Sequence, residues 1–516
     1  METGGLLASA SIDNSYVTKG VIATQHKAAS EVGAQVLRDG GNAIDAAIAA
    51  NAVLCVVYPH MTSVAGDLMA IIWPAGASAP VGLIGAGRSG SLATIDAVRA
   101  RGHDIMPERG VLTVTVPGTV EAWGRLLERF GTWGLGAVLG PAASLAADGY
   151  IITSRLAEFL RSAAGLLGSE PAAQALYPPM EAGMLLRNPD LAAVLRDIGR
   201  SGIGGFYRGG TAAAIVAAIA KRDGLVTAAD LGSHRSSWVE PLAMKYRDVT
   251  VYELPPPTQG LTALAIMARL SLLERADLEP GPEFVERFKR VRDTSYALRD
   301  RYITDPDFAA APLEPFLDPS HAAVGGAGPR DGGDTVYLCA ADEHGNLVSL
   351  IQSVAFDFGS GIVAEGTGML LQNRGCYFSL DPAHVNRLEP RKRTMHTLIP
   401  AMASRDGKPW AVFGTMGGEG QPQIQAQVLV NLVDHHLDPS EAVTRPRIRV
   451  QAGGARMSIE PDYPNAAELA RGDRYFQLMP RHHHSFGHSQ AIVIDGPNLW
   501  RAAADPRSDG SAEYVS

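Results

Sequence analysis

The spacing of hydrophobic positions predicts a mixture of helices and strands. Residues 27–57 carry Ala, Val and Leu at helical spacing, interrupted by Asp39-Gly40-Gly41-Asn42, which predicts a helix, a turn and a second, buried helix. Short apolar runs at 67–73, 81–84 and 249–254 predict strands. Further helical patterns cover residues 120–130 and 142–149. The Ala-rich second helix would allow close packing against a sheet.

A predicted β-hairpin follows a segment rich in proline and glycine. One strand is expected to begin at Val336, a turn to occupy residues 343–346, and a second strand to begin at Leu347. Thr335 then stands at the head of the hairpin. Residues 305–333, which precede it, contain few core residues and many turn formers, so an exposed, mobile connection is expected. On local pattern alone, Thr335 would simply close a surface loop.

Composition limits the class of protein without naming a substrate. The chain has 516 residues, 46% hydrophobic and 19% charged, enough for several domains or for one large multilayer domain. The net charge of −9 provides no basic excess to neutralise phosphates, which argues against a nucleic-acid partner. Residues 1–19 do not resemble a secretory signal, and no long uninterrupted apolar run predicts a membrane span. Cys55, Cys339 and Cys376 form no CxxC pair, so a reducing, cytoplasmic location is predicted.

Thr335 would become a self-sufficient nucleophile if the peptide bond before it were cut. Its new α-amine would have a pKa near ~7.7–8.0, so it could accept the proton of the neighbouring hydroxyl at neutral pH. No separate His or Asp would then be needed.

Motifs along nearly the whole chain resemble the gamma-glutamyltransferase family of N-terminal-nucleophile hydrolases. Asp334-Thr335 with its hairpin and Gly414-Thr415-Met416-Gly417-Gly418 are similar to the small subunit of these enzymes. Four further motifs match in order: Gly40-Gly41-Asn42-Ala43-Ile44-Asp45, Thr115-Val116-Pro117-Gly118-Thr119, Pro255-Pro256-Pro257-Thr258-Gln259-Gly260 and Ala504-Asp505-Pro506-Arg507-Ser508. The resemblance implies a four-layer αββα sandwich of the α+β class.

The same resemblance implies self-cleavage between Asp334 and Thr335. It would yield a large subunit of residues 1–334 and a small subunit of residues 335–516, which together form one structural domain. Thr335 would be the nucleophile and Ser353 the supporting hydroxyl. Gly417 and Gly418 would supply two backbone N–H groups to an oxyanion. The chemistry needs neither a metal nor a cofactor.

The positions that hold a glutamyl group in the family are changed here. Where the family has Asn, Gln and Asp, this chain has Ala355, Arg374 and Tyr377, and His396-Thr397 replaces a serine pair. A glutamyl α-ammonium buried without its carboxylate partner would cost several kcal/mol, so little gamma-glutamyl transfer is expected. Arg88 lies in the region where relatives place an arginine for the substrate carboxylate, although the surrounding motif differs. The expected substrate-binding residues are therefore Arg88, Arg374, Tyr377, His396 and Thr397.

Three short motifs are similar to the branch of the family that includes oxamate amidohydrolase and putative acyltransferases. They are Tyr58-Pro59-His60-Met61, Gln372-Asn373-Arg374-Gly375 and His396-Thr397. The function predicted is a self-processing amidohydrolase that cleaves a small carboxylate-bearing amide such as oxamate through a threonyl acyl-enzyme. Two alternatives remain: a gamma-glutamyltransferase or cephalosporin-type acylase, and an unprocessed, inactive protein that binds a small carboxylate. The sequence leaves open whether several of these two-subunit units assemble into a larger oligomer.

The histidines near the C-terminus do not predict a metal site. His482, His483 and His484 are consecutive, so their side chains point in different directions, and no carboxylate at a ligand spacing accompanies them or His488.

Overall fold

Two seven-stranded sheets form the centre of the computed structural model, which describes residues 16–323, 333–451, 454, 456–472 and 474–516. The first, the β10 sheet, is antiparallel throughout. Its strands, in order across the sheet, are β21 (Ser511–Val515), β2 (Gly20–Thr24), β10 (Asp334–Asp342), β11 (Leu347–Ala355), β3 (Asp67–Trp73), β4 (Val81–Gly85) and β7 (Ser237–Val239).

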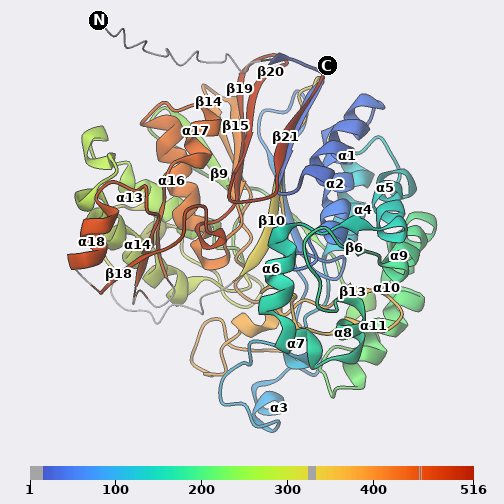
Figure 1. Cartoon of the computed structure of the whole chain (residues 1–516). Coiled ribbons are helices and arrows are strands. Elements are labelled where there is room, and N and C mark those ends of the chain that lie inside the picture. Colours follow the sequence, from blue (N-terminus) through green and yellow to red (C-terminus); the bar gives the residue numbers. More distant parts are fainter. Residues whose placement is uncertain (1–15, 324–332, 452–453, 455, 473) are drawn as a thin grey trace, which may run out of the picture.

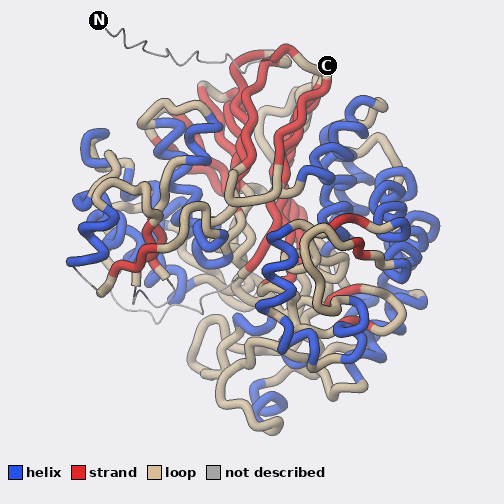
Figure 2. The backbone as a smooth tube through the Cα atoms, in the orientation of Figure 1, coloured by secondary structure: helices blue, strands red, loops and turns tan. Residues whose placement is uncertain are grey.

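The second sheet, the β15 sheet, is also antiparallel. Its strands, in order, are β1 (Tyr16–Val17), β20 (Leu499–Ala504), β19 (Ser489–Gly496), β15 (Lys408–Thr415), β14 (Ala401–Arg405), β9 (Val249–Glu253) and β8 (Leu242–Tyr246). Figure 2 shows the strands of both sheets between two groups of helices.

Helices cover the outer face of each sheet, which completes four layers (Figure 1). The β10 sheet packs against α1 (Lys27–Arg38), α2 (Ala43–Val57) and α4 (Thr119–Phe130), with α5 (Leu135–Asp148), α9 (Pro189–Ser201), α10 (Ile203–Arg208) and α11 (Gly210–Ala220) outside them. The β15 sheet packs against α13 (Gly260–Leu270), α14 (Pro282–Tyr302), α16 (Gln421–Val433) and α17 (Pro439–Thr444). The predicted αββα sandwich is confirmed.

Smaller elements connect or flank these layers. They are α3 (Ile95–Arg99), α6 (Ser154–Ser162), α7 (Ala164–Gly168), α8 (Pro171–Leu176), α12 (Ala228–Ser233), α15 (Glu314–Leu317), α18 (Ala466–Gly472), β5 (Tyr150–Ile151), β6 (Leu185–Leu186), β12 (Val363–Ala364), β13 (Met369–Leu370), β16 (Ile448–Val450), β17 (Met457–Ile459) and β18 (Phe476–Leu478).

The side-chain alternation of β10 separates two hydrophobic cores. Val336 and Leu338 face the helices, whereas Tyr337 and Cys339 face the β15 sheet, where they pack with residues such as Val412. Both faces of β10 are buried, which explains why its sequence is almost continuously apolar. The strand that carries Thr335 is therefore held from both sides.

Most predicted elements are confirmed, with boundaries shifted by a few residues. The break at residues 39–42 separates α1 from α2, and Asn42 caps α2 by accepting from the amides of Ile44 and Asp45. The hairpin is present, but β10 begins at Asp334, so Thr335 lies inside the strand rather than at its head. Arg292 of α14 is buried, at 5% exposure. The glycine-rich residues 324–332 lie outside the described residues.

One apolar segment of the described chain passes a test of length and hydropathy for a membrane-crossing helix. It is Ile203–Ala220, and 44% of it is buried. In the structure the segment consists of two helices, α10 and α11, that are separated at Gly209. Because buried core helices pass the same test, the segment is weak evidence for a membrane span.

Candidate active site

Thr335 lies at an irregularity in the pairing of β10 with β11. Asp334 pairs with Ala355, whereas Val336 pairs with Gln352, so the register shifts by one residue at Thr335. Such a bulge locally redirects the strand. The threonine is fully buried, and its hydroxyl has no hydrogen-bond partner among the described residues. A buried hydroxyl without a partner is uncommon and marks a site where a further polar group is expected.

Ser353 holds the carbonyl group that precedes Thr335. Its Oγ donates to the Asp334 carbonyl at 2.6 Å and accepts from the Ala355 amide at 2.8 Å. Ala355 has a φ of 84°, a conformation that side-chain-bearing residues seldom adopt. The hairpin thus supplies a chain of two hydrogen bonds that ends on the carbonyl of the peptide bond before Thr335.

Gly417 and Gly418 lie near the residues before Thr335, and Gly418 packs directly against Gly333. They follow β15 with φ values of 130° and 50°, which favour glycine at both positions. Gly333, with a φ of 114°, approaches so closely that an added Cβ would lie 2.7 Å from the Gly418 Cα and 3.3 Å from the Tyr377 hydroxyl. The structure therefore brings the two predicted oxyanion glycines and Tyr377 to the predicted cleavage point.

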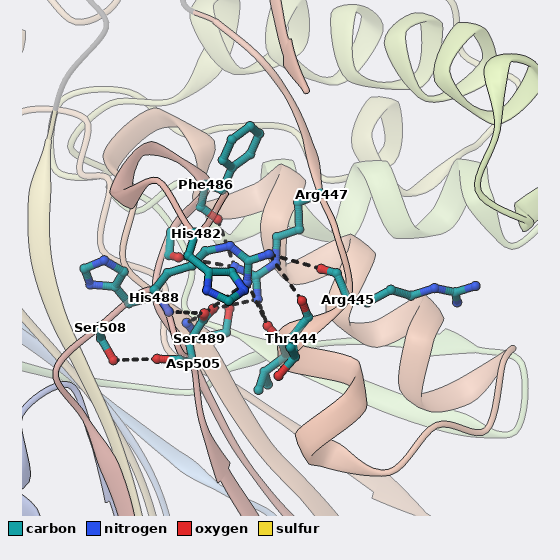
Figure 3. A network of polar contacts seen from close by, with 12 residues as sticks. Thr444, Arg445, Arg447, His482, Phe486, His488, Ser489, Asp505 and Ser508 are labelled. Atoms are coloured by element: carbon teal, nitrogen blue, oxygen red, sulfur yellow. Dashed lines mark hydrogen bonds and ion pairs between the residues drawn. The ribbon is translucent and has the colours of Figure 1, made fainter. Parts of the chain in front are cut away.

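A buried ion-pair network of Arg447 and Asp505, drawn in Figure 3, lies close to the residue that precedes this glycine pair. Arg447 pairs with Asp505 at 2.8 Å and donates to the carbonyls of Phe486 and Gly487. A Cβ on Gly487 would lie 2.6 Å from the Met416 carbonyl oxygen, so the Gly487 backbone packs against the residue preceding Gly417. The C-terminal motif around Asp505 therefore contributes to the site by fixing the backbone beside Gly417.

Arg374 is a buried cation with unused hydrogen-bond donors. The side chain is 1% exposed, and its Nη1 donates to the Thr397 hydroxyl at 2.9 Å. Its Nε and Nη2 have no partner among the described residues, and its guanidinium lies 5.2 Å from the centre of the Tyr377 ring. A buried guanidinium that pairs with no carboxylate among the described residues is costly unless an anion joins it.

His396 lies beside this cation and is held neutral. Its Nε2 is 3.1 Å from a carboxylate oxygen of Asp67, a residue that pairs with Ser353 across β3 and β11. Burial, together with the charge of Arg374, lowers the pKa of His396 to about 4, despite the opposing effect of Asp67. A neutral imidazole here leaves Arg374 as the positive group available to a substrate anion.

A cavity of about 350 Å³ opens beside Asp334 and Gly417. Arg109, which the sequence did not single out, lines it and forms an ion pair with Asp357. Desolvation and the Asp357 carboxylate raise the pKa of Asp334 to about 7, although Arg109 and Arg449 oppose this shift. No motif marked Arg109 or Asp357 in the sequence, because they meet only through the fold.

Arg88 is engaged by carboxylates elsewhere, and neither Arg88 nor Arg374 is among the residues that line this cavity. Its guanidinium forms ion pairs with Asp305 at 2.9 Å and with Asp307 at 2.6 Å, and it also donates to the Arg391 carbonyl. Because two carboxylates balance its charge, the structure does not support the predicted contact between Arg88 and a substrate. Of the five predicted substrate-binding residues, Arg374, Tyr377, His396 and Thr397 lie together.

The chain is similar to known proteins over nearly its whole length. The family model for gamma-glutamyltranspeptidase matches residues 29–515. The glutathione hydrolase-like YwrD proenzyme of Bacillus subtilis is 36% identical, over 96% of this chain and 98% of its own length. The oxamate amidohydrolase proenzyme of Klebsiella pneumoniae is 34% identical, over 96% of this chain and 98% of its own.

A solved structure shows the same architecture over the full length. The cephalosporin acylase from Bacillus halodurans superimposes with a TM-score of 0.90 at 34% identity, covering 100% of this chain and 99% of the acylase chain. The family matched here comprises hydrolases and transferases that act on amide bonds. By family model, by identity to relatives over nearly the whole length and by fold, the chain belongs to the gamma-glutamyltranspeptidase family.

Proposed function

We propose that this protein is a self-processing amidohydrolase that uses Thr335 to cleave small amides whose acyl group carries a carboxylate. Ser353 would assist self-cleavage, and Gly417 and Gly418 would stabilise the oxyanion during turnover. Arg374, with Thr397, would bind the substrate carboxylate. Oxamate is the simplest member of this substrate class.

Self-cleavage would begin with attack of the Thr335 hydroxyl on the Asp334 carbonyl carbon. The Ser353 hydroxyl, 2.6 Å from that carbonyl oxygen, is placed to donate to the developing oxyanion. The C–N bond then breaks, the nitrogen takes up the proton lost by the hydroxyl, and an ester joins Asp334 to the threonine oxygen. Water hydrolyses the ester and leaves Thr335 with a free α-amine.

Turnover would repeat this chemistry on an external amide. The α-amine accepts the hydroxyl proton as the Thr335 oxygen attacks the substrate carbonyl. The oxyanion receives hydrogen bonds from the amides of Gly417 and Gly418. The proton then passes to the departing nitrogen, which leaves as ammonia or an amine, and water hydrolyses the acyl-enzyme.

The observation that carries this proposal is Arg374, a buried guanidinium that pairs with no carboxylate among the described residues. Two of its nitrogens have no partner among the described residues, and Tyr377, which its guanidinium faces, reaches the backbone before Thr335. A carboxylate accepts two parallel hydrogen bonds from a guanidinium. A small substrate that presents a carboxylate would therefore supply the missing partner.

Replacing Arg374 tests the substrate class. Ammonia release is measured for oxamate and for pyruvamide, which has a methyl ketone in place of the carboxylate. Arg374→Met should lower kcat/KM for oxamate by about 30-fold or more, since truncating one partner of a buried charge pair costs about 2–5 kcal/mol. Pyruvamide hydrolysis should change little, and Arg374→Lys should retain part of the oxamate activity. Equal losses for both substrates would contradict a carboxylate-binding role.

A second candidate function is an acylase for larger, apolar groups. A second cavity, of about 520 Å³, shares Phe356 with the cavity beside Asp334 and includes Tyr377. Its lining is largely apolar and includes Ile105, Met106 and Phe378. The substrate panel therefore also includes an acyl-lactam, glutamine and glutathione. Hydrolysis of the acyl-lactam would support the acylase, and hydrolysis of glutamine or glutathione would support a gamma-glutamyl hydrolase. Hydrolysis of oxamate alone would support the function proposed first.

A further inference from the structure

We infer that Gln259 is a positioning residue that holds the oxyanion glycines and the carboxylate-binding side chains in a fixed relation. The inference rests on the proposed function, because it assigns roles to Gly418 and Arg374. Among the described residues, the hydrogen bonds of the Gln259 side chain go to neither Thr335 nor Arg374.

The side-chain amide of Gln259 binds both the oxyanion glycines and the residues proposed to hold the substrate carboxylate. Its Nε2 donates to the Gly418 carbonyl at 2.9 Å and to the Thr397 carbonyl at 3.0 Å. Its Oε1 accepts from Arg299 Nη1 at 3.3 Å. This set of partners fixes the orientation of the amide, because the nitrogen faces two acceptors and the oxygen faces a donor. The residue is fully buried, so water cannot replace these bonds without a structural change.

The backbone around Gln259 is fixed as firmly as its side chain. The Gln259 amide donates to the His396 carbonyl at 2.9 Å, and the His396 amide donates to the Pro257 carbonyl at 2.8 Å. Gln259 also stands immediately before α13, which begins at Gly260. The side chain therefore extends from an anchored point and cannot follow a shift of Gly418 or Thr397.

The two carbonyl groups that accept hydrogen bonds from Gln259 belong to Gly418 and Thr397, and each of these residues has a separate role in the proposed site. Gly418 packs against Gly333 and is proposed to present an amide to the oxyanion. The Thr397 hydroxyl accepts from Arg374. A shift in either contact would change the distance between the attacked carbonyl and the bound carboxylate, and misplacement by about 1 Å can reduce a rate by about 100-fold.

Arg299 extends the same support to the residue after Gly418. It is fully buried, and it pairs with Glu419 as well as with Asp300 at 2.8 Å. Gln259 and Arg299 belong to residues 1–334, whereas Gly418, Glu419 and Thr397 belong to residues 335–516. The small subunit would thus depend on two large-subunit side chains for the geometry of its own catalytic groups.

The test uses Gln259→Met, which keeps the length of the side chain but removes both donors. Gln259→Glu keeps the shape and places an acceptor opposite two carbonyl oxygens. Gln427→Met is the matched control. Gln427 is also buried, and its side chain donates to two carbonyls, that of Gln423 in α16 and that of Ile448 in β16. Thermal melting confirms that each variant folds. Gln259→Asn, which keeps the donor on a shorter side chain, replaces the Met variant if that variant does not fold.

Two readouts separate positioning from general stability. The first is acylation of Thr335 by p-nitrophenyl acetate, which needs no carboxylate site and is followed by nitrophenolate release and by the mass of the small fragment, with Thr335→Ala as background. The second is kcat and KM for oxamate. Gln259→Met and Gln259→Glu should slow acylation by about 10- to 100-fold and raise the KM for oxamate. Gln427→Met should melt earlier than the wild type but stay within about twofold in both readouts.

The acylation and oxamate measurements can fail independently, so failure of the Gln259 role can be told apart from failure of the proposed function. If Gln259→Met matches Gln427→Met in acylation and KM, the inference is overturned. If the wild type is acylated but does not hydrolyse oxamate, the proposed substrate class fails, and the acylation rate of Gln259→Met alone supports or overturns the positioning role. If Thr335 of the wild type is never acylated, both fail.

Discussion

At the scale of single residues, the site combines a buried cation with a buried neutral imidazole. Arg374 and His396 are both about 1% exposed, and the charge of Arg374 adds to burial in disfavouring protonation of His396. Asp67 opposes this shift but does not reverse it. The site should therefore lose stability when His396 is forced to accept a proton.

The stability of the protein in acid tests whether His396 is held neutral. It is measured in the variant Thr335→Ala, which is expected to remain uncut. An unfolded histidine binds a proton near pH 6.5, whereas the folded His396 does so only near pH 4. The unfolded state binds more protons between these values, so the free energy of unfolding should decrease as the pH falls from about 6.5 to about 4. His396→Gln in the same background should lose about 3 kcal/mol less over this range, as measured by urea unfolding. Identical pH profiles would show that His396 is not held neutral.

Some residues of the site were predictable from the sequence and others were not. Thr335, Ser353, Gly417 and Gly418 lie in matched motifs, and the structure brings them together. Arg109 carries no motif, since its contact with Asp357 joins segments 248 residues apart. Arg88 was predicted to contact substrate because its neighbourhood in sequence looks familial, but Asp305 and Asp307, remote in sequence, engage its guanidinium.

At the scale of elements, the hairpin of β10 and β11 concentrates unusual backbone conformations around Thr335. The pairing shifts at this residue, Ala355 has a positive φ, and Gly333 has a φ of 114°. The hairpin itself was predictable from its apolar runs and its turn. The bulge was not, because it arises from the way β10 pairs with β11 rather than from either run of residues alone.

A side chain at position 333 should block self-cleavage. In Gly333→Ala, the new Cβ would lie 2.7 Å from the Gly418 Cα, so backbone must move. The positive φ adds about 1–2 kcal/mol of strain. We expect cleavage, followed over time on a denaturing gel, to slow by more than about 10-fold.

Gly345→Ala is the control for this variant. Gly345 lies in the turn of the same hairpin with a φ of 93°, but an added Cβ would meet nothing within 4 Å. It should suffer a similar strain from the positive φ, without the clash, and still cleave at the wild-type rate. Equal cleavage rates for the two variants would contradict the contact with Gly418.

At the scale of the whole molecule, the predicted subunits are interleaved rather than adjacent. Strands β2, β3, β4 and β7 of the β10 sheet belong to residues 1–334, whereas β11, β21 and all of β10 except its first residue, Asp334, belong to residues 335–516. β10 lies between β2 and β11. Cutting the chain before Thr335 would therefore leave one shared core, and the two fragments should remain associated.

The layered fold was predictable because helical and strand periodicities and the family motifs agree along the chain. The positions of the supporting side chains were not predictable, because they depend on contacts between distant segments. Gln259 shows this difference, since its motif was evident in the sequence but its two acceptors, on Thr397 and Gly418, lie more than a hundred residues away.

The central claim is that Thr335 cuts the chain and becomes its nucleophile, and mass spectrometry of the purified protein tests it most directly. Under denaturing conditions the wild type should give two fragments divided between Asp334 and Thr335. Under native conditions these fragments should form one particle with the combined mass of about 54.4 kDa or a multiple of it. Thr335→Ala should remain a single uncut chain. An uncut wild type, or a Thr335→Ala variant cut at the same bond, would contradict the account.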